Sequence, residues 1–272
     1  NRKNMSGHSK WSTIKHKKGL NDAKKGKAFS KYAQLITVAA REGGADIDSN
    51  PQLRLLVDKA KAESMPVDNI KRAIDRGAGN GADGPVIFEA CSYEGFGPEG
   101  VSVIVDVLTE NRNRAVADIR NIFNESGGNL GDNGSVSWNF DVKGMVLVRC
   151  GKIVPSEKYG EAPKLVDIDP EQVELAIMDV EGAQDIASVD LEDGKGLEVY
   201  CKLEYLGRVR DAIGALGYVV REAQIIKVPK LYKEFTQEQI QRVYDFVMKL
   251  DEYQDVQNVW TDVNPDDLDK IV

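Results

Sequence analysis

Apolar side chains in the first eighty residues of the chain recur at helical spacing. Within residues 21–41 they return every third or fourth position, and this predicts one buried face. That face comprises Phe29, Tyr32, Ile36 and Ala39. A second helix is expected to start at Asn50, with Pro51 in the first helical position, and a third is expected to take Asp68 as its cap. The pattern therefore predicts a small bundle of three short helices.

After residue 85 the period of the apolar positions changes from helix to strand. The predicted elements are strands at 86–93 and 101–108, a helix at 111–126 and a strand at 135–140. The last of these strands is inferred from the alternation of Val136, Trp138 and Phe140 with polar residues. Such an alternation usually marks a core face, although it also resembles the aromatic platform of RNA-binding sheets.

The following segment predicts the order strand, helix, two strands, helix, strand, which is the ferredoxin-like order. The predicted bounds are 144–149, 170–179, 185–190, 196–202, 204–216 and 218–226. A last helix, with Thr236 as N-cap, and a strand at 256–260 supply the elements that the segment 86–140 lacks for a similar sheet.

The predicted fold class is therefore α+β, with an N-terminal three-helix domain followed by two ferredoxin-like α+β domains, one inserted in the other. The expected domains are a basic helical domain at 1–83, a discontinuous α+β domain at 84–141 plus 229–272, and an inserted ferredoxin-like domain at 142–228. A length of 272 residues suits two or three domains of ordinary size.

The charge of the chain is strongly segregated. Residues 1–41 contain eleven Lys and Arg against one acid, Asp22, so this part carries +10 in a protein whose net charge is −8. The remaining residues therefore carry −18. A cluster of cations costs self-repulsion, so the asymmetry indicates a polyanion-binding end, most often one that binds nucleic acid.

The cations of this end are almost all lysines, which favours contact with phosphate rather than reading of bases. The candidate contacts are Lys10, Lys15, Lys17, Lys18, Lys24, Lys25, Lys27 and Lys31. Arg112 and Arg114 are further candidates, because cations are disfavoured in the first turn of a helix. An anion contact and a surface ion pair with Glu110 or Asp118 both stay open for these two arginines.

Other chemistry finds little support in the sequence. The three cysteines are far apart and indicate buried free thiols in a reducing cytosol, and the two histidines, His8 and His16, lack partners for a metal site or a catalytic triad. The glycine-rich stretch 127–135 follows a helix rather than preceding one, so turn glycines explain it better than a phosphate cradle.

Two more possibilities concern DNA and membranes. The helices around Pro66 could form a helix-turn-helix that presents Lys71, Arg72 and Arg76 to DNA, but Asp68 and Asp75 interrupt that surface.

No run approaches the roughly 18 apolar residues of a membrane span, and a cytoplasmic protein without membrane contact is expected.

Several motifs in collinear order resemble the YebC/PmpR family, which includes a mitochondrial translational activator of cytochrome c oxidase. They are G-H-S-K-W…I-K-H-K-K (7–18), D-A-K-K-G-K-x-F-S-K (22–31), N-P-x-L-R (50–54), M-P-x-D-N-I-x-R-A-I-x-R-G (65–77), Y-E-G-x-G-P-x-G-V (93–101), L-T-x-N-R-N-R (108–114) and G-G-N-L-G-x-x-G-S-V-x-W-x-F (127–140). The resemblance implies a three-domain cytoplasmic protein with a discontinuous second domain. It implies a DNA-binding transcriptional regulator or, alternatively, a ribosome-associated factor that eases translation of difficult stretches.

The function expected from the sequence is therefore non-enzymatic regulation of gene expression through nucleic acid. The expected partner is duplex DNA or ribosomal RNA, the ribosome is left open as a further partner, and no cofactor, metal or catalytic residue is expected. The oligomeric state is left open. Neutralising Lys24, Lys27 and Lys31 together is expected to flatten the salt dependence of binding by about three units for all nucleic acids alike.

Overall fold

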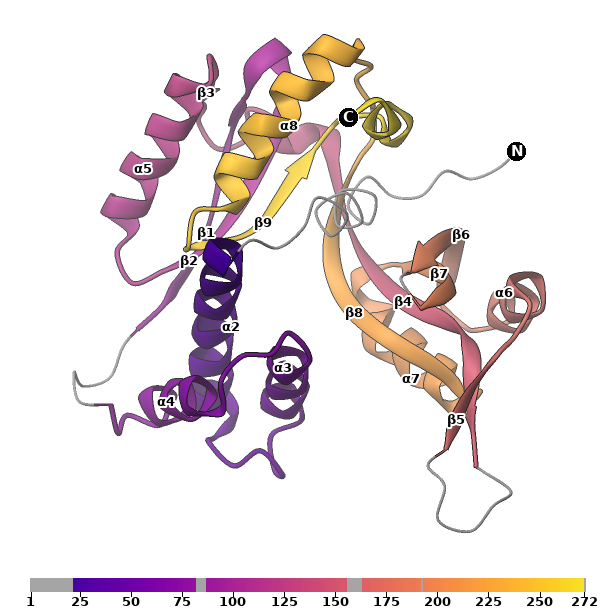
Figure 1. Ribbon diagram of the computed structural model, residues 1–272. Coiled ribbons are helices and arrows are strands. Elements are labelled where there is room, and N and C mark those ends of the chain that lie inside the picture. Colours follow the sequence, from indigo (N-terminus) through magenta and orange to yellow (C-terminus); the bar gives the residue numbers. More distant parts are fainter. Residues whose placement is uncertain (1–21, 82–86, 156–162, 192, 272) are drawn as a thin grey trace. The chain divides into compact units, whose positions relative to one another are not determined.

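The computed structural model describes residues 22–81, 87–155, 163–191 and 193–271 (Figure 1). Contacts within the chain divide it into two compact units. The first unit holds Lys18–Ser137 and Glu238–Thr261, and the second unit holds Trp138–Gln237 and Asp262–Val272. The three-domain division of the sequence stays a prediction.

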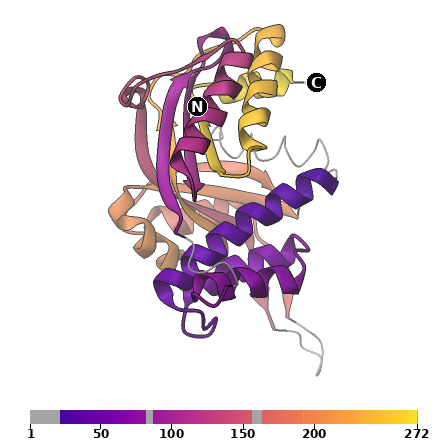
Figure 2. The same cartoon turned by 90° about the vertical axis from the view of Figure 1, so that its left-hand side faces the viewer.

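Three helices open the first unit, as the apolar pattern predicts. They are α2 (Asp22–Gly43), α3 (Pro51–Ala62) and α4 (Val67–Gly77), and the later turns of α2 pack against the other two helices while its first turns extend past them (Figures 1 and 2). Asn50 caps α3, since its side-chain oxygen accepts a hydrogen bond from the Leu53 amide at 3.0 Å. The predicted Asp68 cap is wrong. Pro66 takes the cap position of α4, and its carbonyl accepts the Ile70 amide, so Asp68 lies inside the first turn.

The helices enclose a small apolar core and approach one another most closely at a glycine. Ile36 of α2, Leu53 and Val57 of α3 and Ile70 of α4 are almost fully buried in this core. A Cβ atom at Gly77 would collide with the Thr37 carbonyl oxygen and lie 2.8 Å from the Ala40 Cβ. The end of α4 therefore needs glycine in order to touch α2.

Sheet A completes the first unit and is built from two segments that lie far apart in the sequence. Its antiparallel strands lie in the order β3-β1-β2-β9, and their bounds are Asn129–Leu130, Glu89–Phe96, Ser102–Thr109 and Val256–Thr261. Helices α5 (Arg112–Glu125) and α8 (Gln237–Asp251) lie side by side on one face, where the rings of Phe123 and Phe246 meet edge to face at 4.9 Å (Figures 1 and 2). The late helix and strand thus complete the earlier sheet, as predicted.

The second unit contains sheet B and two helices. The strands are β4 (Phe140–Val154), β5 (Lys164–Asp167), β6 (Ala183–Leu191), β7 (Gly194–Cys201) and β8 (Tyr218–Pro229), and the helices are α6 (Pro170–Met178) and α7 (Leu206–Ala215). β8 pairs with β4, β4 with β7 and β7 with β6, all antiparallel. Both helices pack on one face over Val146, Leu197 and Val199. This arrangement confirms the predicted α+β fold class.

The 3-10 turns link these elements, and one of them corrects a prediction. They are η1 (Pro98–Gly100), η2 (Ser137–Asn139), η3 (Leu203–Tyr205) and η4 (Pro265–Lys270). The strand predicted at 135–140 is wrong, because its centre is the turn η2, and Trp138 is 63% exposed rather than part of a core. The physical reason is a carboxylate: Glu94 accepts hydrogen bonds from the Val136 and Ser137 amides, which a strand would have used for pairing.

Candidate nucleic-acid interface

Helix α2 carries the central part of the predicted lysine cluster. Lys24, Lys25 and Lys27 lie in its first two turns, where the structure describes the backbone and not these side chains. Four other candidates fall outside the described residues, namely Lys10, Lys15, Lys17 and Lys18. Of the basic N-terminal part, the structure therefore describes only the portion that begins with the first turns of α2.

Lys31, one turn further along α2, has an intramolecular partner. Its Nζ donates a hydrogen bond to the Asp251 carbonyl oxygen at 2.8 Å and lies 3.3 Å from the Asp251 carboxylate. Its side chain is only 18% exposed. Lys31 therefore ties α2 to the end of α8, and contact with an external phosphate would compete with this ion pair.

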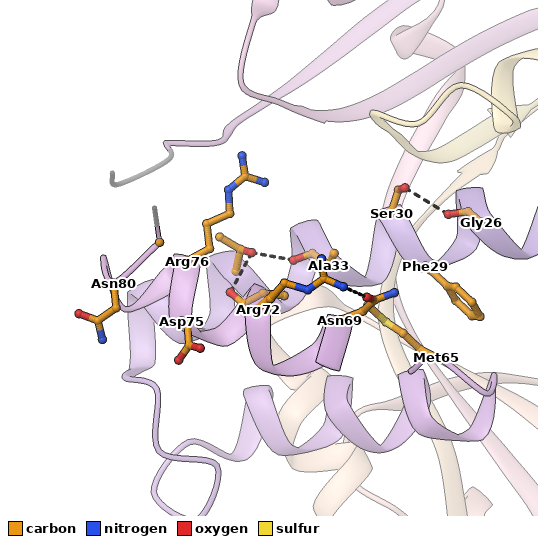
Figure 3. Close-up of a pocket in the computed structure, with 13 residues that line it drawn as sticks. Gly26, Phe29, Ser30, Ala33, Met65, Asn69, Arg72, Asp75, Arg76 and Asn80 are labelled. Atoms are coloured by element: carbon orange, nitrogen blue, oxygen red, sulfur yellow. Dashed lines mark hydrogen bonds between the residues drawn. The ribbon is translucent and has the colours of Figure 1, made fainter. Parts of the chain in front are cut away.

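A groove of about 700 Å³ runs between α2 and α4 in the first unit (Figure 3). We call it the α2–α4 groove. Apolar side chains line part of it, among them Phe29 and Ala33 of α2 and Met65 just before α4. Figure 3 shows Arg76 and Asn80 toward one end and Phe29 and Met65 toward the other.

Two arginines that were not among the candidate site residues line this groove. Arg72 donates from its guanidinium to the Asn69 side-chain oxygen at 2.5 Å, and Arg76 forms an ion pair with Glu110 at 3.0 Å. Both partners leave donors of the planar guanidinium group available, because each arginine has five N–H groups. The sequence signal for these two arginines is their spacing of four residues on a short helix, which suggested a helix-turn-helix surface rather than a groove.

The Arg76–Glu110 ion pair brings α4 near the start of α5, where the other two candidates lie. Asn111 caps α5 by accepting a hydrogen bond from the Arg114 amide at 3.0 Å. The Arg112 side chain is exposed and has no ion-pair partner among the residues that the structure describes. It is therefore available for an anion.

Arg114 is instead part of a partly buried network. Its Nη2 lies 2.9 Å from a carboxylate oxygen of Asp255, a residue that is 2% exposed. Thr109 donates to the same carboxylate at 2.7 Å, and Gln34 of α2 donates at 3.1 Å. Hydrogen bonds to Asp255 and Tyr253 raise the pKa of Arg114. Arg114 therefore forms an ion pair, as one of the two alternatives predicted, but its partner is Asp255 rather than Glu110 or Asp118.

The glycine-rich loop does not offer a free phosphate cradle. Gly127 and Gly134 have φ values of 78° and 92°, as expected of turn glycines. The backbone donors of this loop already bind an anion from the chain itself, because Glu94 accepts hydrogen bonds from the Gly134, Val136 and Ser137 amides at 2.9–3.1 Å. Burial raises the pKa of Glu94, but these three donors outweigh burial and lower it from its usual value.

No metal site is formed in the part of the chain that the structure describes, and two of the three cysteines are buried. No group of three His, Cys, Asp or Glu side chains there is placed to hold a metal ion. Cys150 and Cys201 are fully buried, and burial raises the pKa of the Cys150 thiol to about 11. Among the same residues, no helix is long and apolar enough to cross a membrane.

Known proteins similar to this chain cover nearly its whole length. Residues 9–80 match the TACO1/YebC protein N-terminal domain, and residues 88–263 match the TACO1/YebC second and third domain. A protein of Geotalea uraniireducens named "Probable transcriptional regulatory protein" is 41% identical over 98% of this chain and 100% of its own length. A protein of the same name from Desulfatibacillum aliphaticivorans is 43% identical over 97% of this chain and 98% of its own length.

The fold has a counterpart among solved structures. The crystal structure of the conserved hypothetical protein Aq1575 from Aquifex aeolicus superposes with a TM-score of 0.69 at 34% sequence identity. The superposition covers 89% of this chain and 91% of that one. Since the two domain models together span most of the sequence and these relatives are similar from end to end, the chain belongs to the TACO1/YebC family.

Proposed function

We propose that this protein is a non-enzymatic regulator of gene expression that binds nucleic acid through its basic N-terminal part. The relatives named probable transcriptional regulatory proteins support the regulatory role. The observation that carries the binding proposal is the charge distribution, +10 within residues 1–41 against −18 in the remainder. Such a field attracts a polyanion to one end of the chain and repels it from the rest.

The binding mode proposed is contact with the sugar-phosphate backbone. Lysine makes point-charge contacts that hold phosphate without reading bases, and lysines dominate residues 1–41. Arg112, exposed at the start of α5, and the arginines of the α2–α4 groove add cations on the unit that contains α2. This preference for backbone over sequence also favours a second candidate function, a ribosome-associated translation factor that binds ribosomal RNA.

Fluorescence anisotropy of the full chain with duplex DNA and with ribosomal RNA fragments, at several salt concentrations, tests the proposal. The substitutions Lys24→Gln and Lys27→Gln together are expected to weaken binding to every nucleic acid and to reduce the salt slope by about two units, because each lost phosphate contact removes about 0.9. Lys195→Gln with Lys202→Gln in the second unit is the matched control and should leave the slope unchanged.

The same titrations separate the two candidate functions. A regulator of transcription should bind one promoter sequence far more tightly than random duplex, whereas a translation factor should prefer ribosomal RNA and co-sediment with ribosomes at low salt. Binding that persists unchanged in the Lys24/Lys27 double variant would contradict the proposed contact surface.

A further inference from the structure

The α2–α4 groove has features that phosphate contact alone does not require. Helices α2 and α4 touch closely at Gly77 and Thr37, and the groove lies beside that contact, from Gly26 and Met65 to Asn80. Gly26 and Thr37 lie eleven positions apart on the helix, so the α2 wall is about 16 Å long. A volume of about 700 Å³ is in the range of sites that hold small organic molecules.

The walls of the groove suit a flat heteroaromatic ring. Phe29 and Ala33, both half-buried, provide apolar surface of the kind on which unpaired bases stack, while Met65 is only 4% exposed and belongs to the core of the bundle. The Asn69 amide lines the groove near Phe29, and its oxygen also accepts a hydrogen bond from Arg72 (Figure 3). An amide can both donate to and accept from the edge of a base.

The charged groups of the groove match a nucleotide rather than a base alone. Arg72 and Arg76 lie four residues apart on α4, and a guanidinium can bind a phosphate through two parallel hydrogen bonds. Asp75 also lines the groove, and its carboxylate has no ion-pair partner among the described residues. A carboxylate repels phosphate but accepts a hydrogen bond from a ribose 2′-hydroxyl, the group by which a protein distinguishes RNA from DNA.

We propose that the α2–α4 groove binds one unstacked nucleotide of single-stranded RNA, with the base on Phe29 and Ala33 and the phosphate on Arg72 and Arg76. This inference rests on the proposed nucleic-acid function and narrows its ligand. A base inside a duplex is stacked and paired and does not enter such a groove. The lysines at positions 24, 25 and 27 flank Gly26 at one end of the groove, where the neighbouring phosphates of the same strand would pass.

Fluorescence of 2-aminopurine tests this inference, because the emission of this base analogue changes when it leaves a stack. The full chain is titrated into a ten-nucleotide single-stranded RNA with 2-aminopurine at its centre, into the same sequence as single-stranded DNA, and into the RNA duplex. Ser30→Phe places a ring in the groove from an exposed position, where the Ser30 hydroxyl donates to the Gly26 carbonyl of its own helix. Gln52→Phe, exposed on α3 and outside the groove, is the matched control.

Ser30→Phe is expected to weaken single-stranded RNA binding about tenfold and to abolish the 2-aminopurine change, with duplex binding and the Gln52→Phe variant unaffected. Asp75→Ala should reduce the preference for RNA over single-stranded DNA. Equal effects of Ser30→Phe and Gln52→Phe, or an unchanged 2-aminopurine signal, would overturn the groove inference while lysine-dependent binding still supports the proposed function. A wild-type protein that binds none of the three ligands at low salt would overturn the proposed function and the inference together.

Discussion

The buried carboxylate of Asp255 gives the sharpest prediction about stability. It is the common acceptor for side chains from α2, from the end of β2 and from α5, namely Gln34, Thr109 and Arg114. The change Asp255→Ala removes this acceptor and leaves three donors without it. All three donors belong to the first unit, so its unfolding is the quantity to follow.

The magnitude follows from how well water can replace the lost partner. Thr109 is completely buried, and a buried hydroxyl without an acceptor costs about 1–3 kcal/mol. The Arg114 side chain is 48% exposed, so water takes over much of its role and the lost ion pair contributes only about 0–1 kcal/mol. With about 0.5 kcal/mol for the half-buried Gln34 amide, the expected loss is about 3 kcal/mol.

Urea unfolding and native-state hydrogen exchange of the variant measure this loss. Protection of the amides in β2 and β9 is expected to fall about a hundredfold, since each 1.4 kcal/mol corresponds to a factor of ten. Asp255→Asn keeps an acceptor for Thr109 and should restore most of the stability. Asp58→Ala, an exposed acid on α3, is the control and should stay within about 0.5 kcal/mol of wild type. An Asp255→Ala variant as stable as this control would refute the network as a source of stability.

Three further predictions concern packing, pH and thiols. Gly77→Ala should lower the free energy of unfolding by about 1–3 kcal/mol in urea titrations, because the added methyl group collides with Thr37 and Ala40. In the control Gly79→Ala the methyl group meets no neighbouring atom, so any loss of stability there comes from the positive φ of that position. The pKa of Glu94 is lower in the folded state than its unfolded value near 4.5, so the ionised carboxylate stabilises the folded state at a pH above 4.5. This contribution is lost as the pH falls through the folded pKa. The stability difference between wild type and Glu94→Gln should therefore be full at pH 7 and vanish in acid, and a pH-independent difference would contradict the backbone contacts. A thiol reagent at pH 8 should modify Cys91 first, and Cys150 and Cys201 only on unfolding, because both are buried and burial raises their pKa values.

The sequence predicted those elements whose signals are local. Asn50 and Pro51 mark the start of α3 through a cap that spans three residues, and the stripe from Phe29 to Ala39 defines the buried face of α2. The ferredoxin-like order was likewise readable from successive strand and helix periods, and sheet B confirms it.

Contacts between distant residues decided the elements that the sequence did not predict correctly. The turn at Trp138 depends on Glu94, which lies more than forty residues earlier, so the alternation around Trp138 was mistaken for a strand. The short strand β5 is exposed along its length and has no apolar alternation, and it pairs with the end of β4.

Of the candidate site, only the excess of positive charge could be predicted from the sequence. The excess of lysine near the start of the chain is a property of composition, whereas the pairing of Arg114 with Asp255 joins residues 141 positions apart. Likewise, the groove that Arg72 and Arg76 share with Phe29 depends on how α2 and α4 pack. Side-chain pairing within the folded unit thus sets which cations remain available to a ligand.

Ultraviolet crosslinking of the full chain in cells, followed by mass spectrometry of the peptides that carry nucleotides, tests the central claim most directly. The account predicts adducts within residues 10–31 and on α4 near Arg72 and Arg76, with the attached nucleic acid identified by sequencing. Adducts confined to the second unit, or recovery of no nucleic acid at all, would contradict it.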